Sequence, residues 1–336
     1  MLKKHRNQLE NNEPKVYVLH ENDEWIAPLE QAFQKQEVPY EFWFINNGQL
    51  NLSDIPPEGV FYNRMSASSH TRDHRFAIEL SEPILAWLQR HNRRTINGRN
   101  ALGLEVRKTE QYLGMQQFGI QTPDTIVTNN QHDLIQAAKN FDHTPFLVKP
   151  NRGGKGSGVE LFHSASELEK ELNKNSSKFQ SLDGLILLQE YVKPADGNII
   201  RMEFIGGKFF YAVQVDASGG FELCPADQCN DEDNDQFCPA DSKSAGFKIL
   251  KDYHDPNIPL YEKFLQANGI EVGAIEYVED QLGNRYVFDL NINTNYNSGA
   301  EKNAGEEYRG MEQIASFLKK ELDFISQNKA AEIKVE

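Results

Sequence analysis

Cysteine is scarce in this sequence, with three residues in a chain of 336. A small, odd number in a long chain argues against a disulfide-stapled scaffold and indicates a reducing compartment. Positive charge is also in deficit, because 35 lysines and arginines oppose 50 aspartates and glutamates and leave a net charge of −15. Since nucleic acids and anionic membranes attract basic surfaces, we expect neither as a partner.

Long apolar runs are absent too. No stretch approaches the roughly 20 apolar residues that span a bilayer, and the polar start of the chain lacks the apolar segment of a signal peptide. We therefore expect a cytoplasmic protein. The length of 336 residues allows two or three domains, and a composition of 39% hydrophobic and 25% charged residues is typical of globular proteins.

The first part of the chain alternates apolar, strand-like runs with an amphipathic segment. The expected order is a strand over residues 15–19, a helix over 25–37, and strands over 41–45 and 59–63. Such alternation predicts a small parallel α/β domain. We place this domain at residues 15–99, after a disordered N-terminus over residues 1–14.

A polar loop follows the third of these strands. Its candidate substrate-binding residues are Asn63, Arg64, Ser66, His70 and Arg72. Ligands collect at the carboxyl ends of parallel strands, and arginine binds carboxylate or phosphate groups with two parallel hydrogen bonds. The alternative is a capped entrance to the helix that we predict over residues 73–90.

Three further helices are predicted along the next part of the chain. One continuous helix covers residues 100–118 and contains Lys108, and a second covers residues 131–140. Ser166 and Glu169 have the spacing of a capping box that starts a third helix.

The segment over residues 146–158 carries the strongest local signal. Strand-like runs over 146–149 and 159–162 flank a loop that contains four glycines. The loop residues are Gly153, Gly154, Lys155, Gly156, Ser157 and Gly158, and Lys149 ends the first run. Glycines let backbone N–H groups turn toward an anion, so we interpret the segment as a hairpin with a phosphate-binding flap.

Two familiar phosphate motifs do not fit this flap. A Walker loop and a dinucleotide fingerprint each lead into a helix, whereas a strand follows here. A purely structural glycine-rich hairpin is the alternative interpretation of the segment by itself.

Three strands are predicted after the flap. The first covers residues 185–192, and the next two, over 199–205 and 208–215, are joined by a Gly206-Gly207 pair that is typical of a tight hairpin.

All three cysteines lie in an acidic loop over residues 224–241, at positions Cys224, Cys229 and Cys238. Their spacing matches no CxxC pair, so a zinc site in this loop is disfavoured.

Residues 271–293 carry the second strong signal. Two alternating strands, over 271–278 and 285–293, surround a short turn, and centring that turn places Glu276 opposite Asp289 with Asn291 on the same face. The opposite, core-directed face is predicted to hold Ile275, Tyr277, Tyr286, Phe288, Leu290 and Ile292. Paired carboxylates repel each other unless a cation neutralises them, and Mg²⁺ that also binds phosphates needs only one or two carboxylates. A solvated polar face is the alternative.

Together these segments resemble the ATP-grasp superfamily, and within it the RimK-like and glutathione-synthetase-like carboxylate–amine ligases. The matching motifs, in the order the family has them, are Lys108 before Gly119-Ile120-Gln121-Thr122-Pro123, then Phe146-Leu147-Val148-Lys149-Pro150 with its glycine loop, Leu188-Gln189-Glu190-Tyr191-Val192, Ile200-Arg201-Met202-Glu203-Phe204, and Phe288-Asp289-Leu290-Asn291. Each motif is weak alone, but five in this order are specific.

The resemblance implies an α/β and α+β architecture, the ATP-grasp fold, in which two α+β subdomains clasp ATP behind the small parallel N-terminal domain. We expect the central subdomain at residues 100–190, the C-terminal subdomain at 191–328 and a tail at 329–336.

The resemblance also implies roles for single residues. Lys108, Lys149 and the glycine loop would bind the phosphates of ATP. The main chain near Glu190, Tyr191 and Val192 would bind the adenine, Asp196 the ribose, and Gln189 would also belong to the ATP site. Glu276, Asp289 and Asn291 would hold one or two Mg²⁺, with Mn²⁺ as an alternative, and Arg201 would stabilise the transition state.

The implied reaction joins a small-molecule carboxylate and an amine, such as an amino acid or a peptide, through an acyl phosphate. Asn293 and Asn295 would help to read the substrate. Two alternatives stay open: another ATP-grasp outcome such as phosphotransfer or ester formation, and a non-catalytic nucleotide-binding protein. The oligomeric state also stays open, with a homo-oligomer as the form to test.

Overall fold

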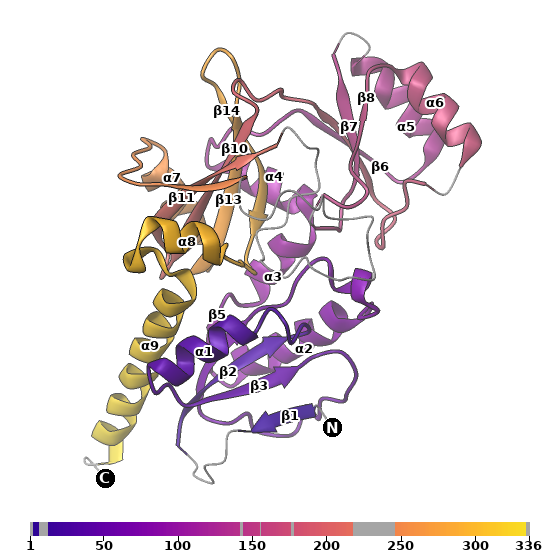
Figure 1. Ribbon diagram of the computed structural model, residues 1–336. Helices are drawn as coiled ribbons and strands as arrows, with labels where there is room; N and C mark the ends of the chain where they lie inside the picture. The colour runs from indigo at the N-terminus through magenta and orange to yellow at the C-terminus, as the bar shows by residue number, and fades with distance from the viewer. Residues whose placement is uncertain are drawn as a thin grey trace.

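A computed structural model describes residues 3–6, 13–141, 144–154, 156–175, 178–217 and 246–333. Three β-sheets with helices packed around them make up the molecule (Figure 1). Lys155 and the acidic loop with its three cysteines lie outside the described residues, so the predictions made for them are not tested.

The N-terminal sheet has the strand order β1-β3-β2-β4-β5. Its strands are β1 (Lys3–Arg6), β2 (Lys15–His20), β3 (Tyr40–Phe44), β4 (Gly59–Asn63) and β5 (Arg94–Ile96). β2 pairs in parallel with β3 and β4, and β4 with β5, which confirms the predicted parallel domain. β1 corrects the expectation of a disordered N-terminus, because it pairs antiparallel with β3 and so uses backbone groups that an edge strand leaves open.

Helices cover both faces of this sheet. One face packs against α1 (Ala27–Lys35) and α9 (Gly310–Ile333), and the other packs against α2 (Ala77–Arg90). α2 begins four residues later than predicted, because a short 3₁₀ turn (Ser69–Arg72) ends at Asp73 in the left-handed region with φ of 60°.

α9 is the longest helix and runs along the N-terminal domain down to the C-terminal end of the chain in Figure 1. Its last residue is Ile333, so most of the expected tail continues this helix. Within the ranges that the structure describes, no helix combines the length and the apolarity needed to cross a membrane.

The central sheet has the order β6-β9-β7-β8 and carries two helices. Its elements are β6 (Thr125–Thr128), α5 (Gln131–Ala138), a 3₁₀ turn (Lys139–Phe141), β7 (Phe146–Pro150), β8 (Glu160–Phe162), α6 (Ala165–Lys174) and β9 (Ile186–Glu190). β7 and β8 pair antiparallel, which confirms the predicted hairpin under the glycine loop. The cap of α6 is Ser164, which accepts a hydrogen bond from the Glu167 N–H, two residues before the predicted capping box; this start buries Leu168 and Leu172.

The third sheet is antiparallel throughout, with the order β12-β11-β10-β13-β14. Its elements are β10 (Asn198–Ile205), β11 (Lys208–Asp216), β12 (Phe247–Leu250), α7 (Ile258–Ala267), β13 (Val272–Glu279), β14 (Arg285–Asn291), α8 (Ser298–Ala304) and a 3₁₀ turn (Glu306–Tyr308). Gly206 and Gly207, with φ of 63° and 70°, join β10 and β11. Two positive φ values in sequence suit a tight hairpin turn, as predicted.

The helix predicted over residues 100–118 is broken in two, α3 (Arg99–Val106) and α4 (Lys108–Gln117). Arg107 between them is extended, and Asn151 from the end of β7 caps α4: its carbonyl accepts from the Lys108 N–H at 3.2 Å and its side chain accepts from the Thr109 N–H at 2.9 Å. This cap places Lys108 at the first position of α4. Both helices pack against the core of the third sheet rather than that of the central sheet.

Candidate active site

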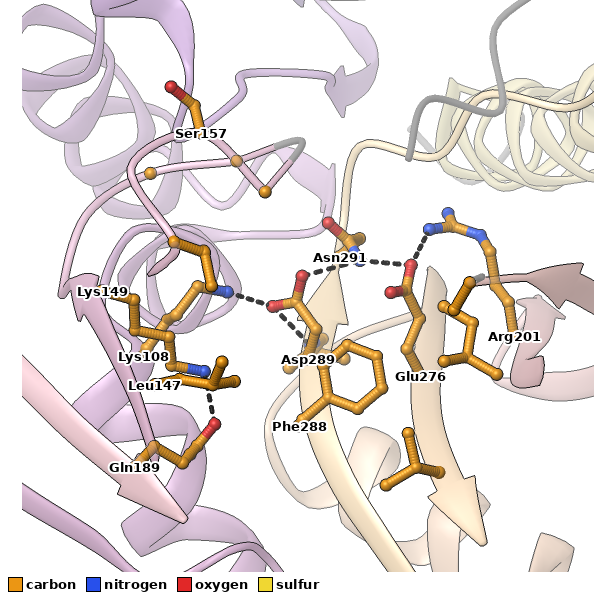
Figure 2. Close-up of a pocket in the computed structure, with 18 of the residues that line it drawn as sticks. Lys108, Leu147, Lys149, Ser157, Gln189, Arg201, Glu276, Phe288, Asp289 and Asn291 are labelled. Atoms are coloured by element: carbon orange, nitrogen blue, oxygen red, sulfur yellow. Dashed lines mark hydrogen bonds and ion pairs between the residues drawn. The ribbon is translucent and has the colours of Figure 1, made fainter. Parts of the chain in front are cut away.

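A cavity of about 470 Å³ lies between the central sheet, the third sheet and the polar loop that follows β4. Figure 2 shows Lys108, Lys149 and Gln189 on one side of it and Glu276, Asp289 and Arg201 on the other. Segments separated by nearly two hundred residues in the sequence therefore face one another here.

The two carboxylates of the C-terminal hairpin lie side by side in this cavity. Glu276 on β13 is paired with Asp289 on β14, as the sequence predicts. The Asn291 amide nitrogen lies 3.2 Å from Glu276 Oε1 and 3.5 Å from Asp289 Oδ2, so the three side chains converge on one region (Figure 2).

A β-bulge changes what lies beside Asp289. The pairing moves from Glu276–Asp289 to Tyr277–Val287, which leaves Phe288 as an extra residue on β14. Strict alternation had predicted Phe288 on the core face, but Val287 takes the core position and Phe288 lines the cavity next to Asp289. Bulges of this kind re-aim side chains next to functional sites.

Two cations neutralise the carboxylate pair. Lys108 forms an ion pair with Asp289, and Arg201 on β10 forms ion pairs with Glu276 and with Glu203. Burial by itself lowers the pKa of Lys108, but the charge of Asp289, its hydrogen bond to Lys108 and the nearby Tyr112 and Glu276 together leave the pKa above its ordinary value. Burial and the adjacent Asp289 raise the pKa of Glu276 even though Arg201 opposes the change.

Lys149 has a different environment, although it lies in the same cavity. Its side chain is buried, and the ammonium donates hydrogen bonds to the Tyr112 hydroxyl and to Gln189 Oε1, each at 2.6 Å. Burial and then the positive charge of Lys108 lower its pKa well below the ordinary value. The Lys149 side chain thus donates hydrogen bonds to neutral groups, and an added anion would favour its charged form.

The glycine loop forms one wall of the cavity. Gly153, Gly154, Gly156 and Ser157 line it, and Gly156 and Gly158 have positive φ of 74° and 75°. A Cβ at Gly154 would lie 3.3 Å from the Ser68 side chain, so the loop packs closely on the N-terminal domain. Arg152 at the base of the loop turns away from the cavity and binds Glu79 on α2 at 2.6 Å.

Apolar side chains also line the cavity, together with the end of β9 and the segment that follows it. Leu147, Val192, Val278 and Phe288 are among its walls, and Gln189, Glu190 and Tyr191 line it as well. The N–H groups of Glu190 and Tyr191 already bind the carbonyls of Asp124 and Pro145. These two N–H groups are thus already paired and are not free for the predicted adenine contact.

Asp196, the predicted ribose ligand, lies outside the cavity lining, next to Gly197, which lines it. Its carboxylate accepts a hydrogen bond from the Asn198 N–H at 3.0 Å, in a turn that leads into β10.

The predicted substrate residues fall into two groups. Ser66, Asn293 and Asn295 line the cavity. The other four lie behind it: Asn63 binds the Asn97 carbonyl, Arg64 binds Asn293, Thr294 and Asn295, His70 contacts the Ala67 carbonyl, and Arg72 binds Glu21. The two arginines therefore support side chains of the cavity and do not face it themselves.

This chain is similar to known proteins in both sequence and fold. Residues 107–222 match the family model of the RimK-like ATP-grasp domain. The solved D-cycloserine synthetase DcsG superposes with a TM-score of 0.62 at 16% identity, over 91% of this chain and 99% of that one. The RimK domain protein of Sphaerobacter thermophilus DSM 20745 does so with a TM-score of 0.61 at 16% identity, over 90% and 98%. Residues 107–222 are therefore similar to a RimK-like ATP-grasp domain, and the chain has the ATP-grasp fold.

The sequence relatives of this chain are distant, and only part of each relative aligns with it. A probable alpha-L-glutamate ligase of Desulfotalea psychrophila (strain LSv54 / DSM 12343) is 23% identical over 206 residues, which is 61% of this chain and 39% of the relative. A probable alpha-L-glutamate ligase 2 of Shewanella amazonensis (strain ATCC BAA-1098 / SB2B) is 26% identical over 50% of this chain and 61% of the relative. The aligned part thus spans less than two thirds of the length of either ligase.

The residues at the bulged hairpin of the ATP-grasp fold suit a hard cation. Two carboxylates and the amide of Asn291 supply oxygen ligands on one face of β13 and β14. Mg²⁺ favours such oxygen ligands and takes its remaining ligands from water or phosphate. In the part of the chain that the structure describes, no group of three histidine, cysteine, aspartate or glutamate side chains is arranged to hold a metal, and the hairpin offers two carboxylates and one amide.

Among the cavity residues that were not predicted from the sequence are Trp25, Ser68 and Glu105. Trp25 and Ser68 line the cavity from the N-terminal domain, and Glu105 lines it from α3. Glu105 is buried and accepts hydrogen bonds from the Ala67 N–H at 3.2 Å and the Ile292 N–H at 2.7 Å. A glutamate in a predicted helix resembles a solvent-exposed residue, so no local signal marks it. Ser68 could have been predicted from the sequence, because it belongs to the polar loop after β4.

Replacing Glu105 with glutamine is expected to change the pH dependence of stability. Burial raises the pKa of Glu105 from an ordinary value of 4.5 to about 7. Between these values the unfolded chain has released the proton while the folded chain keeps it, so the wild type loses stability as pH rises through this window and Glu105→Gln does not. The measurement is urea unfolding between about pH 4.5 and about pH 7.5. Over this range the free energy of unfolding of the wild type should fall by up to about 3 kcal/mol relative to that of Glu105→Gln. A difference that is independent of pH would contradict this.

Proposed function

We propose that this ATP-grasp chain is an ATP-dependent carboxylate–amine ligase, which forms an amide through an acyl phosphate and releases ADP and phosphate. One observation carries the proposal. The paired carboxylates Glu276 and Asp289, the cations Lys108, Lys149 and Arg201, and the glycine loop all border one cavity. This set matches the charges of a metal–triphosphate ligand, with anionic groups for the cation and cationic groups for the phosphates.

In this proposal the nucleotide lies along the cavity. The adenine lies beside the apolar side chains of Val192 and Phe288, and the triphosphate extends toward Lys108 and Lys149 under the glycine loop. The buried Lys149 ammonium gains an anionic partner when the triphosphate arrives. Such charge-assisted hydrogen bonds are stronger than those that Lys149 makes to neutral groups.

Glu276, Asp289 and Asn291 would hold one or two Mg²⁺, or Mn²⁺ instead. When bound, the metal draws charge from the phosphate oxygens and helps the leaving ADP to carry its negative charge. Lys108 and Arg201 now pair with the two carboxylates, and they would be free to bind phosphate oxygens if Asp289 and Glu276 held the metal.

The chemistry needs no side-chain nucleophile. A substrate carboxylate oxygen bonds to the γ-phosphorus while the bond to the β-phosphate oxygen breaks, which yields an acyl phosphate and ADP. The substrate amine then attacks the acyl carbon, the carbon–oxygen bond to phosphate breaks with its electron pair, and the amine loses a proton. Gly154 packed on Ser68 closes the cavity and so keeps water from the acyl phosphate.

The substrates are proposed to meet at the end of the cavity next to Ser66, Ser68, Asn293 and Asn295. The relatives named alpha-L-glutamate ligase direct us to L-glutamate as the first amine or carboxylate to test. PsnB, an ATP-grasp ligase solved with a phosphomimetic variant of its minimal precursor, Mg and ADP, superposes with a TM-score of 0.60 at 14% identity over 91% of this chain and 99% of that one. This similarity suggests peptides as a second class of substrate to test.

Product analysis tests the proposal. Purified protein with Mg²⁺ and ATP is screened for ADP release against carboxylates and amines that include L-glutamate and short peptides. Release is expected to need both partners, and mass spectrometry should show a product equal to their sum less one water. A phosphorylated or ester product would favour the other ATP-grasp outcomes. ATP binding without turnover across the library would favour a nucleotide-binding protein without catalysis.

A further inference from the structure

A second cavity, of about 520 Å³, lies beside the nucleotide cavity. α1 of the N-terminal domain forms one wall, and the segment that runs from Asn295 through α8 into α9 forms the other. Its volume is similar to the 470 Å³ of the nucleotide cavity. It falls within the range of about 300–1,000 Å³ that is typical of ligand sites. It can therefore hold a ligand comparable in bulk to a nucleotide, larger than a free amino acid.

The two cavities share two lining residues, Trp25 and Asn295. Both are held by arginines of the polar loop after β4. The Arg72 guanidinium lies 4.6 Å from the centre of the Trp25 ring, and Arg64 donates a hydrogen bond to Asn295 Oδ1 at 2.8 Å. Arg64 is almost fully buried and has no carboxylate partner among the described residues. This loop thus frames the boundary between the cavities.

The lining of the second cavity mixes both charges with apolar groups. Its charged side chains are Glu24, Lys35, Glu301, Lys302, Arg309 and Glu312. Glu312 pairs with Lys35 at 2.9 Å and with Arg309 at 3.0 Å, whereas Glu24 and Lys302 form no ion pair within the described chain. Trp25, Tyr296 and Met311 add apolar surface. A peptide, with amides along its length and side chains of either charge, suits such a lining better than a purely anionic or purely apolar ligand.

We propose that the second cavity binds a peptide substrate of the ligase and presents its reacting end to the nucleotide cavity between Trp25 and Asn295. This inference rests on the proposed ligase function and adds the substrate class and the place where the substrate lies.

Two variants of α1 test it. Gln31 is exposed and lines the second cavity, whereas Gln34 is exposed on the same helix but does not line it. ADP release is measured with a pool of uncapped tetrapeptides and with a pool of free amino acids. Overpacking is unfavourable by an amount that corresponds to about tenfold or more in an equilibrium constant. We expect Gln31→Trp to raise KM for the tetrapeptides by this amount and to leave KM for ATP unchanged. Gln34→Trp should change neither.

If turnover needs only free amino acids and is unchanged in Gln31→Trp, the inference is overturned, whereas the ligase proposal stands. Hydrogen exchange gives a readout that does not depend on turnover. The tetrapeptide pool should slow amide exchange in α1 and α8 of the wild type, and less so in Gln31→Trp. If neither pool releases ADP, the wider screen of carboxylates and amines decides the ligase proposal, and exchange alone decides the cavity: slowed exchange supports a peptide site, and unchanged exchange overturns it.

Discussion

Asp289→Asn is expected to lower the rate of ADP release about a thousandfold, the scale of losing a group that stabilises developing charge. The substitution keeps the shape of the side chain and removes its charge. Asp289 is one of the two facing carboxylates and the ion-pair partner of Lys108. The variant thus weakens the cation site and leaves Lys108 without its counter-charge in one step.

A matched substitution separates this effect from a general one. Asp323 is exposed on α9, far from the cavity in sequence and not part of its lining. Asp323→Asn should stay within about twofold of the wild type, as surface changes usually do. Circular dichroism checks that both variants fold. If Asp289→Asn retained activity within about tenfold of the wild type, the hairpin would not hold the charges that drive the reaction.

The facing carboxylates could be predicted because their signal is local. Alternation along two strands and the position of one turn are enough to set Glu276 opposite Asp289. The same rule misplaces Phe288, because a bulge shifts the register by one residue within the same hairpin. Nothing in the alternation marks a bulge, which depends on what the cavity side of the strand must accommodate.

Features that depend on distant partners could not be predicted. The helix predicted over residues 100–118 breaks at Arg107 because Asn151, more than forty residues away, caps the second half. Arg64 carries the residue type of an anion ligand, yet it is buried against the Asn293–Asn295 loop. A sequence shows which groups can bind a carboxylate, but tertiary packing decides whether they meet the ligand or each other.

Lys149→Met is expected to weaken nucleotide binding about ten- to hundredfold, since a hydrogen bond to a charged group contributes about 1.5–3 kcal/mol. Without nucleotide, the same variant should be at least as stable as the wild type. Lys149 is 5% exposed and is surrounded by the neutral groups of Tyr112 and Gln189 and by the like charge of Lys108. Methionine fills a similar volume without a charge.

The sizes of the opposing free energies favour a Lys149→Met variant that is at least as stable as the wild type. Burying an ammonium group costs several kcal/mol, whereas an unsatisfied Gln189 Oε1 costs only about 1–3 kcal/mol. The direction with pH follows as well. Because the folded chain holds the pKa of Lys149 well below 10.5, the unfolded chain binds more protons between the two values. Wild-type stability therefore rises with pH through that window, and the variant lacks this rise.

Thermal unfolding with and without ADP, together with calorimetric titration of the nucleotide, measures both effects. Lys208→Met is the matched control, because Lys208 is 76% exposed and forms an ion pair with Glu262 on the surface. A Lys149→Met protein that melts earlier without nucleotide but binds nucleotide like the wild type would assign Lys149 to structure. The expected opposite result has a physical reason: a cation that is costly in the empty cavity is the one that gains most when the triphosphate arrives.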